Sequence, residues 1–217
     1  MKFRAVIFDL WQTLVPFPVD SANEMYGRLA EAWGADPEPF YELWNARRRE
    51  RETGPMEPHL RSIAEELGLR GDLNAVITIR RDWTREALVP RPDAVPTLEE
   101  LRRRGHKLGM ISACSQDVPD VWEGTPFGTL FDSAIFSCSV GVSKPDRRIY
   151  ELAAQELEAE PADCLFVGDG ANDELPGAEQ AGMTAVQLRA PGEALTPEGE
   201  RWTGRYVERL SDVLELV

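Results

Sequence analysis

The sequence predicts an α/β fold: a doubly wound parallel sheet with a helical bundle inserted after its first strand. Three observations lead to this prediction. Short apolar, β-branched runs recur along the chain, helical patterns separate most of them, and one long segment near the N-terminus shows helical patterns only. Such sheets are right-handed, and they gather their functional groups at the carboxyl ends of the strands.

Five segments have the composition of buried parallel strands. The first contains apolar, β-branched and aromatic residues and no Gly or Pro inside. The five segments are residues 3–9, 106–112, 131–136, 163–168 and 184–189. Helices are expected around residues 97–104, which end at Gly105, and over residues 145–157 and 173–181. We therefore expect one core domain made of residues 1–16 and 91–217.

Residues 17–90 show no strand pattern and are predicted to form a cap of four short amphipathic helices. Met25, Leu29 and Trp33 follow one another at helical spacing before Gly34, and a later helix is expected to stop at Gly68. A bundle inserted after the first strand would lie over the strand ends like a lid. Its aromatic side chains are expected mainly in the core of the bundle.

The composition limits the classes of partner. The chain has 217 residues, and 24 Lys and Arg against 38 Asp and Glu give a formal charge of −14. Such a surface repels nucleic acid and anionic membranes, and no apolar stretch approaches the ~20 residues of a membrane span. We therefore expect neither nucleic acid nor a membrane as a partner and predict a cytoplasmic protein. The sequence does not predict its oligomeric state. Three widely spaced cysteines fit neither a disulfide framework nor a zinc site.

Polar residues stand where the strands are expected to end. Asp9 closes the first strand and Ser112 the second, while Asp169 ends a later one and Asp173 follows it by four residues. Alone, Asp9 could equally form a turn. Carboxylates that meet at one edge of a sheet repel one another, so a cluster of them needs cations. Lys144, in the segment GVSKPD, and a hard, oxygen-preferring divalent ion are expected to supply the positive charge.

In order and separation these segments resemble the four motifs of the haloacid dehalogenase-like (HAD) hydrolase superfamily. VIFDLWQTLV is similar to the nucleophile strand of that family, and MISACS to its serine or threonine strand. GVSKPDRRIY is similar to its lysine motif, and CLFVGDGANDELPGAEQAGM to its acidic metal motif. The resemblance covers essentially the whole chain, and the helical insertion matches the cap that follows the first motif in many members.

The resemblance implies magnesium-dependent hydrolysis of a small anionic substrate, a phosphate ester. Asp9 would be the nucleophile that forms a covalent aspartyl intermediate. Ser112 would donate a hydrogen bond to the transferring group, and Lys144 would neutralise Asp9 and the substrate anion. The implied ligands of Mg²⁺ are Asp9, Asp169, Asp173 and the backbone carbonyl of Trp11. Thr13, Ser112 and Ala113 would lie beside the substrate. Thr13 could also fix the loop after the nucleophile, or its hydroxyl could simply belong to a turn.

Two residues depart from the family pattern. Phosphatases of the superfamily carry a second aspartate two positions after the nucleophile, which protonates the leaving alcohol, and here that position is Trp11. Losing such a general acid costs about 10²- to 10⁴-fold, and the loss is greatest for alkoxide leaving groups. Ala113 stands where many members have asparagine. His59 in the cap could supply the missing acid/base, although a solvated loop histidine is the simpler interpretation.

Two other functions remain open. The 2-haloacid dehalogenases of the family lack the second aspartate, and a departing halide needs no proton. They generally work without magnesium and without the motif that GDGAND preserves, and they use an arginine near the start of the cap, where the first helix offers only Arg28. The third possibility is a ligand-binding relic without catalysis, which the retention of all the charged motif residues argues against.

The Arg47–Arg51 run in the cap also allows two interpretations. It could draw an anionic substrate under the lid, or it could be a solvated helix face paired with Glu50 and Glu52. The solvated face is the simpler of the two.

Overall fold

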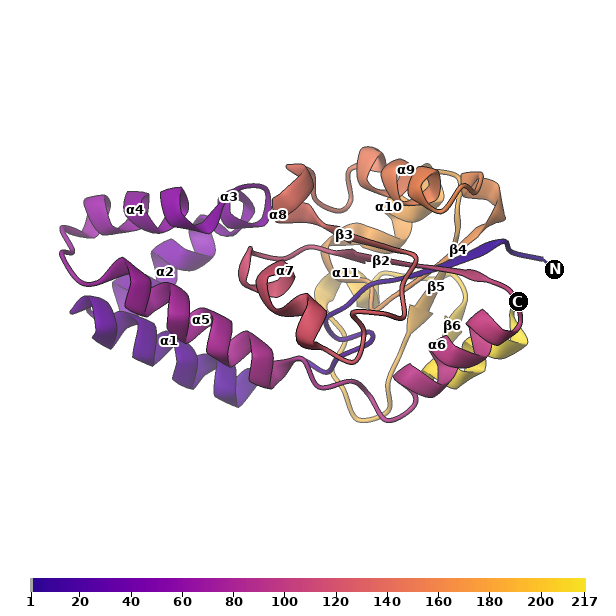
Figure 1. The fold of residues 1–217 in the computed structure, drawn as a ribbon, viewed down its shortest axis with the longest axis horizontal. Coiled ribbons are helices and arrows are strands. Elements are labelled where there is room, and N and C mark those ends of the chain that lie inside the picture. The colour runs from indigo at the N-terminus through magenta and orange to yellow at the C-terminus, as the bar shows by residue number, and fades with distance from the viewer. Residues whose placement is uncertain (1) are drawn as a thin grey trace.

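A computed structural model describes residues 2–217 (Figure 1) and confirms the α/β fold. Its sheet has six strands in the order β3-β2-β1-β4-β5-β6, and each neighbouring pair is parallel. The strands are β1 (Ala5–Phe8), β2 (Lys107–Ser112), β3 (Ser133–Phe136), β4 (Cys164–Gly168), β5 (Thr184–Leu188) and β6 (Tyr206–Val207). All five predicted strands are present. The edge strand β6 was not predicted, because two residues are too few to give a pattern.

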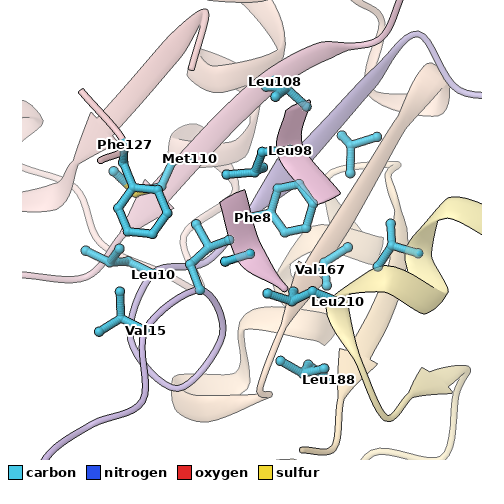
Figure 2. Close-up of a cluster of buried hydrophobic side chains, with 14 of the residues drawn as sticks. Phe8, Leu10, Val15, Leu98, Leu108, Met110, Phe127, Val167, Leu188 and Leu210 are labelled. Atoms are coloured by element: carbon cyan, nitrogen blue, oxygen red, sulfur yellow. The ribbon is translucent and has the colours of Figure 1, made fainter. Parts of the chain in front are cut away.

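Helices cover both faces of the sheet, so it is doubly wound. Along β1, Val6 and Phe8 point to one face and Ala5 and Ile7 to the other, as the two-residue period of a strand requires. The first face packs against α6 (Ala94–Arg103) and the 3-10 helix η4 (Leu210–Glu215), and Figure 2 shows this cluster. The second face packs against α9 (Arg147–Glu156) and α10 (Glu174–Gln180).

Short elements complete the core beyond the two helical layers. They are α7 (Asp117–Val121), α8 (Ser137–Val140), α11 (Pro197–Glu200), η1 (Trp122–Gly124), η2 (Pro161–Asp163) and η3 (Ala171–Asp173). Cys114 and Cys164 are buried and Cys138 is half-buried, and all three are free thiols. None of the helices in residues 2–217 has the length and apolar content that a membrane crossing would need.

The segment between β1 and α6 is helical, as predicted, but it contains five helices instead of four. They are α1 (Val19–Trp33), α2 (Pro37–Ala46), α3 (Arg48–Glu52), α4 (Met56–Leu67) and α5 (Leu73–Ala87). The five-residue α3 is too short to produce a periodic pattern, so the sequence did not separate it from α2. Four of the helices, α1, α2, α4 and α5, share an apolar cluster of their own, which includes Leu29, Phe40 and Trp44. Figure 1 shows this cap beyond the end of the sheet toward which β1 runs.

A buried ion pair joins the cap to the core. Asp117, on core helix α7, is 1% exposed, and its Oδ2 accepts hydrogen bonds from Arg80 Nη2, at 2.7 Å, and from Thr84 Oγ1, both on cap helix α5. Ser115 Oγ donates to the other carboxylate oxygen, at 2.5 Å. A buried ion pair favours one arrangement of the groups that make it, because any other arrangement leaves a charge buried without its partner. The cap is therefore held in one position on the core.

Replacing Asp117 with alanine is expected to destabilise the protein by about 3–5 kcal/mol, because Arg80 would stay buried without its partner. Asp120→Ala is the matched control, since Asp120 joins the same two helices by pairing with Arg81 at 2.6 Å, but at a partly exposed position. That change is expected to cost at most about 1 kcal/mol. Urea unfolding of both variants measures the difference, and equal losses would contradict the assigned role of Asp117.

Candidate active site

The carboxyl ends of β1 and β4 bring two aspartates together with a lysine. Asp9 directly follows β1, its backbone N–H donates to Val167 O at 2.9 Å, and its side chain is buried. Asp169 follows β4 and is also buried. Lys144 lies in the loop before α9, only 4% exposed, and its Nζ donates to carboxylates of both Asp9 and Glu174. The structure thus brings together three of the residues that the sequence singled out.

A third carboxylate, that of Glu174, completes this cluster. One oxygen each from Asp9, Asp169 and Glu174 lie within 4.8 Å of one another. Glu174 is the first residue of α10, and its Oε1 accepts a hydrogen bond from the Gly170 N–H at 2.9 Å. A Cβ on Gly168 would lie 2.1 Å from that same oxygen. The glycine at the end of β4 is therefore needed to let the glutamate side chain into the cluster.

The expectation that Asp173 joins the cluster has to be corrected to Glu174. Asp173 has a φ of 54°, its side chain is 55% exposed, and Oδ1 pairs with Arg201 Nη2 at 3.1 Å. The left-handed backbone at this residue turns its side chain to the surface. Helical periodicity could have indicated Glu174. Gly177 and Ala178 pack on the core, and Glu174, three and four residues before them, lies on the same face of the helix.

The other predicted residues lie at or just after the carboxyl ends of the paired strands β1 and β2. Ser112 and Thr13 are fully buried, and neither hydroxyl has a hydrogen-bond partner among residues 2–217. An orphaned hydroxyl is costly unless a ligand satisfies it, so Ser112 at the end of β2 is suited to bind a substrate oxygen. Trp11 stacks on Trp83 of the cap with ring centroids 6.0 Å apart and meets Phe17 edge-on at 5.6 Å.

A cavity of about 290 Å³ separates the core cluster from the cap. Asp9, Trp11, Ala113, Lys144, Asp169 and Glu174 line it on the core side. Tyr26, Asn45, Arg48, Arg51, Glu52, Arg80 and Trp83 line it on the cap side. Arg28 is exposed and does not line the cavity, so the first cap helix supplies no arginine to it.

The arginine run divides in the structure. Arg47 bonds to Glu66 and Ser62, and Arg48 bonds to Glu52 at 2.5 Å, which agrees with a paired helix face. Arg51 differs, because its side chain is buried and faces the cavity. The interpretation of the run as a solvated face is therefore wrong for Arg51.

The charges of the cluster are not balanced by protein groups. Burial raises the pKa of Asp169 to about 6, and the charge of Asp9 adds to the effect. Burial, and then Asp9, also raise the pKa of Glu174 well above its usual range. Burial alone would lower the pKa of Lys144, but the charges of Asp9 and Glu174 outweigh it and raise that pKa. When all three carboxylates are ionised they exceed the one ammonium by two negative charges, and the raised pKa values express the cost of that excess. An all-oxygen donor set of this kind fits a hard divalent cation, which would favour the ionised form.

Comparison with known proteins decides the family. A family model described as haloacid dehalogenase-like hydrolase matches residues 3–182. The chain belongs to this family of hydrolases.

Relatives of the HAD-like chain include both phosphatases and dehalogenases. It is 32% identical to the phosphatase MT3486 of Mycobacterium tuberculosis over 89% of this chain and 90% of that protein. It is 30% identical to an (S)-2-haloacid dehalogenase of Pseudomonas sp. strain YL over 91% of this chain and 87% of that protein. A glyceraldehyde 3-phosphate phosphatase of Methanopyrus kandleri is 33% identical over 53% of this chain. The matched region spans only 50% of that relative.

Solved structures share the whole HAD-like fold. A HAD phosphatase from Thermococcus onnurineus superposes with a TM-score of 0.75 at 23% identity, covering 98% of this chain and 97% of the other. A 2-haloacid dehalogenase from Pseudomonas syringae gives a TM-score of 0.69 at 23% identity, with coverages of 99% and 97%. At this identity the likeness concerns the fold alone.

His59 does not supply an acid/base to this HAD-like site. It lies inside α4 rather than in a solvated loop, it is 5% exposed, and it does not line the cavity. Neither ring nitrogen has a hydrogen-bond partner among residues 2–217. Burial, helped by the charge of Arg51, lowers the pKa of His59 to about 4. The histidine is a neutral core residue of the cap, and both sequence-based interpretations of it are wrong.

Replacing Glu174 with glutamine is expected to weaken Mg²⁺ binding at least about 10-fold, a loss typical even of groups that only support a ligand. Asp173→Asn is the matched control, because its side chain faces Arg201, and it is expected to change the affinity less than twofold. Calorimetric titration with MgCl₂ compares the two. A larger loss in the Asp173 variant would restore the original motif assignment.

His59 is expected to make stability depend on pH between about 6.5 and 4. In that window the unfolded chain binds a proton at His59 and the folded chain does not, so acid favours unfolding. The free energy of unfolding should fall with decreasing pH more steeply in the wild type than in His59→Gln, by up to about 1.4 kcal/mol per pH unit. Denaturant unfolding at pH 7, 6 and 5 measures both slopes, and parallel profiles would contradict the buried neutral state.

Proposed function

We propose that this HAD-like hydrolase cleaves a small anionic phosphate ester with Mg²⁺ through an aspartyl-phosphate intermediate on Asp9. The observation that carries the proposal is the buried group of Asp9, Asp169 and Glu174 with Lys144 as its sole salt-bridge partner within residues 2–217. Two uncompensated charges in a buried oxygen cluster favour a divalent cation over a neutral ligand. A cytoplasmic location belongs to the same proposal.

Each residue then has a role in the reaction. Asp9 attacks phosphorus while the ester P–O bond breaks and the leaving group departs as an oxyanion. A water molecule later attacks the aspartyl phosphate, which releases phosphate and restores the Asp9 carboxylate. Asp169 and Glu174, with Asp9 and the Trp11 carbonyl, would hold Mg²⁺, which when bound stabilises negative charge on the transferring group. Lys144 holds Asp9 in place, and the free Ser112 hydroxyl donates to a phosphoryl oxygen. The cap excludes bulk water from the cavity.

Trp11 restricts the leaving group. No proton donor stands at this position, and the indole is committed to packing against Trp83 and Phe17 of the cap segment. Glu52, the carboxylate on the cap side of the cavity, accepts a hydrogen bond from Arg48. Without an acid at position 11, leaving groups that depart as stable anions are favoured, so aryl and acyl phosphates are better substrates than alkyl phosphates.

Dehalogenation is the second candidate, and Trp11 is the observation that favours it. Carbon–halogen cleavage by Asp9 needs no acid for the halide, and a haloacid dehalogenase is among the relatives at 30% identity. Dehalogenation of this kind does not need a divalent cation, so it does not explain a buried cluster whose ionised carboxylates exceed its cations by two charges. We therefore place it second.

With an aryl phosphate as substrate, EDTA is expected to abolish turnover and added MgCl₂ to restore it. Asp9→Asn should remove activity entirely, because an amide does not form the covalent intermediate. Phosphate release is the measurement, with Asp173→Asn as an active control. Halide release from 2-chloropropionate in the presence of EDTA, without any phosphate release, would overturn the proposal in favour of dehalogenation.

A further inference from the structure

Arg51 is a buried cation held against an aromatic wall of the cavity. It lies in α3 and is 7% exposed. Its Nη1 donates to Trp44 O at 2.5 Å, and its guanidinium carbon lies 4.7 Å from the centroid of the Trp44 ring. These two contacts fix the plane of the guanidinium and occupy one of its five N–H donors. Burial lowers its pKa to about 10, so the group stays charged at neutral pH.

The other arginines of the cavity have carboxylate partners, and Arg51 does not. Arg48 pairs with Glu52 and Arg80 with Asp117. No carboxylate among residues 2–217 lies within salt-bridge distance of Arg51, and the Glu52 charge acts on it only from farther away. Burying an unpaired charge is costly, and the usual compensation is an opposite charge. The cavity beside Arg51 is where such a charge can bind.

The excess charge at Arg51 indicates the class of anion. The cap side of the cavity carries one uncompensated positive charge, whereas the core side needs a divalent cation to become neutral. A carboxylate, with a charge of −1, would neutralise the single positive charge of Arg51. A second phosphate dianion would bring more negative charge than Arg51 can neutralise. A carboxylate also accepts two parallel N–H bonds from one guanidinium edge.

We propose that Arg51 binds a carboxylate of the substrate, which makes the substrate a phosphorylated carboxylic acid with its phosphate at Asp9 and its carboxylate under the cap. This inference rests on the proposed phosphate-ester hydrolysis for the phosphate end. The carboxylate end stands on the contacts of Arg51 alone.

Matched aryl phosphates test the inference. The 3- and 4-carboxyphenyl phosphates are compared with the 3- and 4-carbamoylphenyl phosphates, which have similar shape and no charge. With MgCl₂ the wild type is expected to prefer the better carboxylate isomer to its amide by roughly 10- to 100-fold in kcat/KM, the range for hydrogen bonds to a charged group. Arg51→Gln should bring the ratio close to one, and Arg51→Lys should keep part of it.

Arg48→Gln is the matched control, because Arg48 lies on the same helix and lines the same cavity but is paired with Glu52. The carboxylate-to-amide ratio of this variant is expected to stay near that of the wild type. Equal kcat/KM values for acid and amide in the wild type, or an equal fall of the ratio in both arginine variants, would overturn the inference while leaving phosphate-ester hydrolysis intact.

A binding measurement separates this site from catalysis. Benzoate is expected to raise the Tm of the wild type and of Arg48→Gln, but not that of Arg51→Gln, and benzamide should raise none of them. If no phosphate ester is cleaved, the proposed function fails and the benzoate result still decides the carboxylate site. Equal shifts with benzoate in the wild type and in Arg51→Gln would overturn it, and the Tm without ligand shows whether each variant is folded.

Discussion

The ion pairs of Lys144 with Asp9 and Glu174 are the constraint on which the rest of the site depends. Three segments far apart in sequence, the end of β1, the loop before α9 and the first turn of α10, meet at one buried ammonium. Moving any of them would leave a charge buried without a partner, at a cost of several kcal/mol. The sheet therefore does more than carry these groups, because its β1–β4 pairing and the space above Gly168 let them meet.

The cap arginines that line the cavity are also paired with carboxylates, with one exception. Arg80 is neutralised by Asp117 of the core, and Arg48 by Glu52 within the cap, so the docked bundle brings to the cavity one positive charge that no salt bridge neutralises. The core brings two excess negative charges when its three carboxylates are ionised. Trp11 stacks on Trp83 between these two sides, so the position of the expected acid/base is occupied by a residue that packs against the cap. Under the proposed function, the side chain that packs against the cap is therefore also the one that limits the choice of leaving group.

The sequence predicted the parts of this structure that repeat a pattern over several residues. Strands buried on both faces read as continuous apolar runs, and Asp9, Lys144 and Asp169 followed from their places beside such runs. The choice of Glu174 over Asp173 depends on two consecutive left-handed residues, Asn172 and Asp173, and motif spacing does not reveal their backbone conformation. The burial of His59 and Arg51 was not predicted, because the sequence around a polar residue in a helix does not show which neighbours cover it.

Arg51 also shows why charge counts along a sequence mislead. Five consecutive residues of the run include four arginines, and any pairing rule based on spacing treats them alike. Arg47 ends α2 and precedes α3, and within α3 the side chain of Arg51 packs on Trp44 while that of Arg48 pairs with Glu52. A residue that packs its cation on an indole inside a cavity loses solvation that its packing only partly restores. The remaining deficit gives a bound anion its affinity.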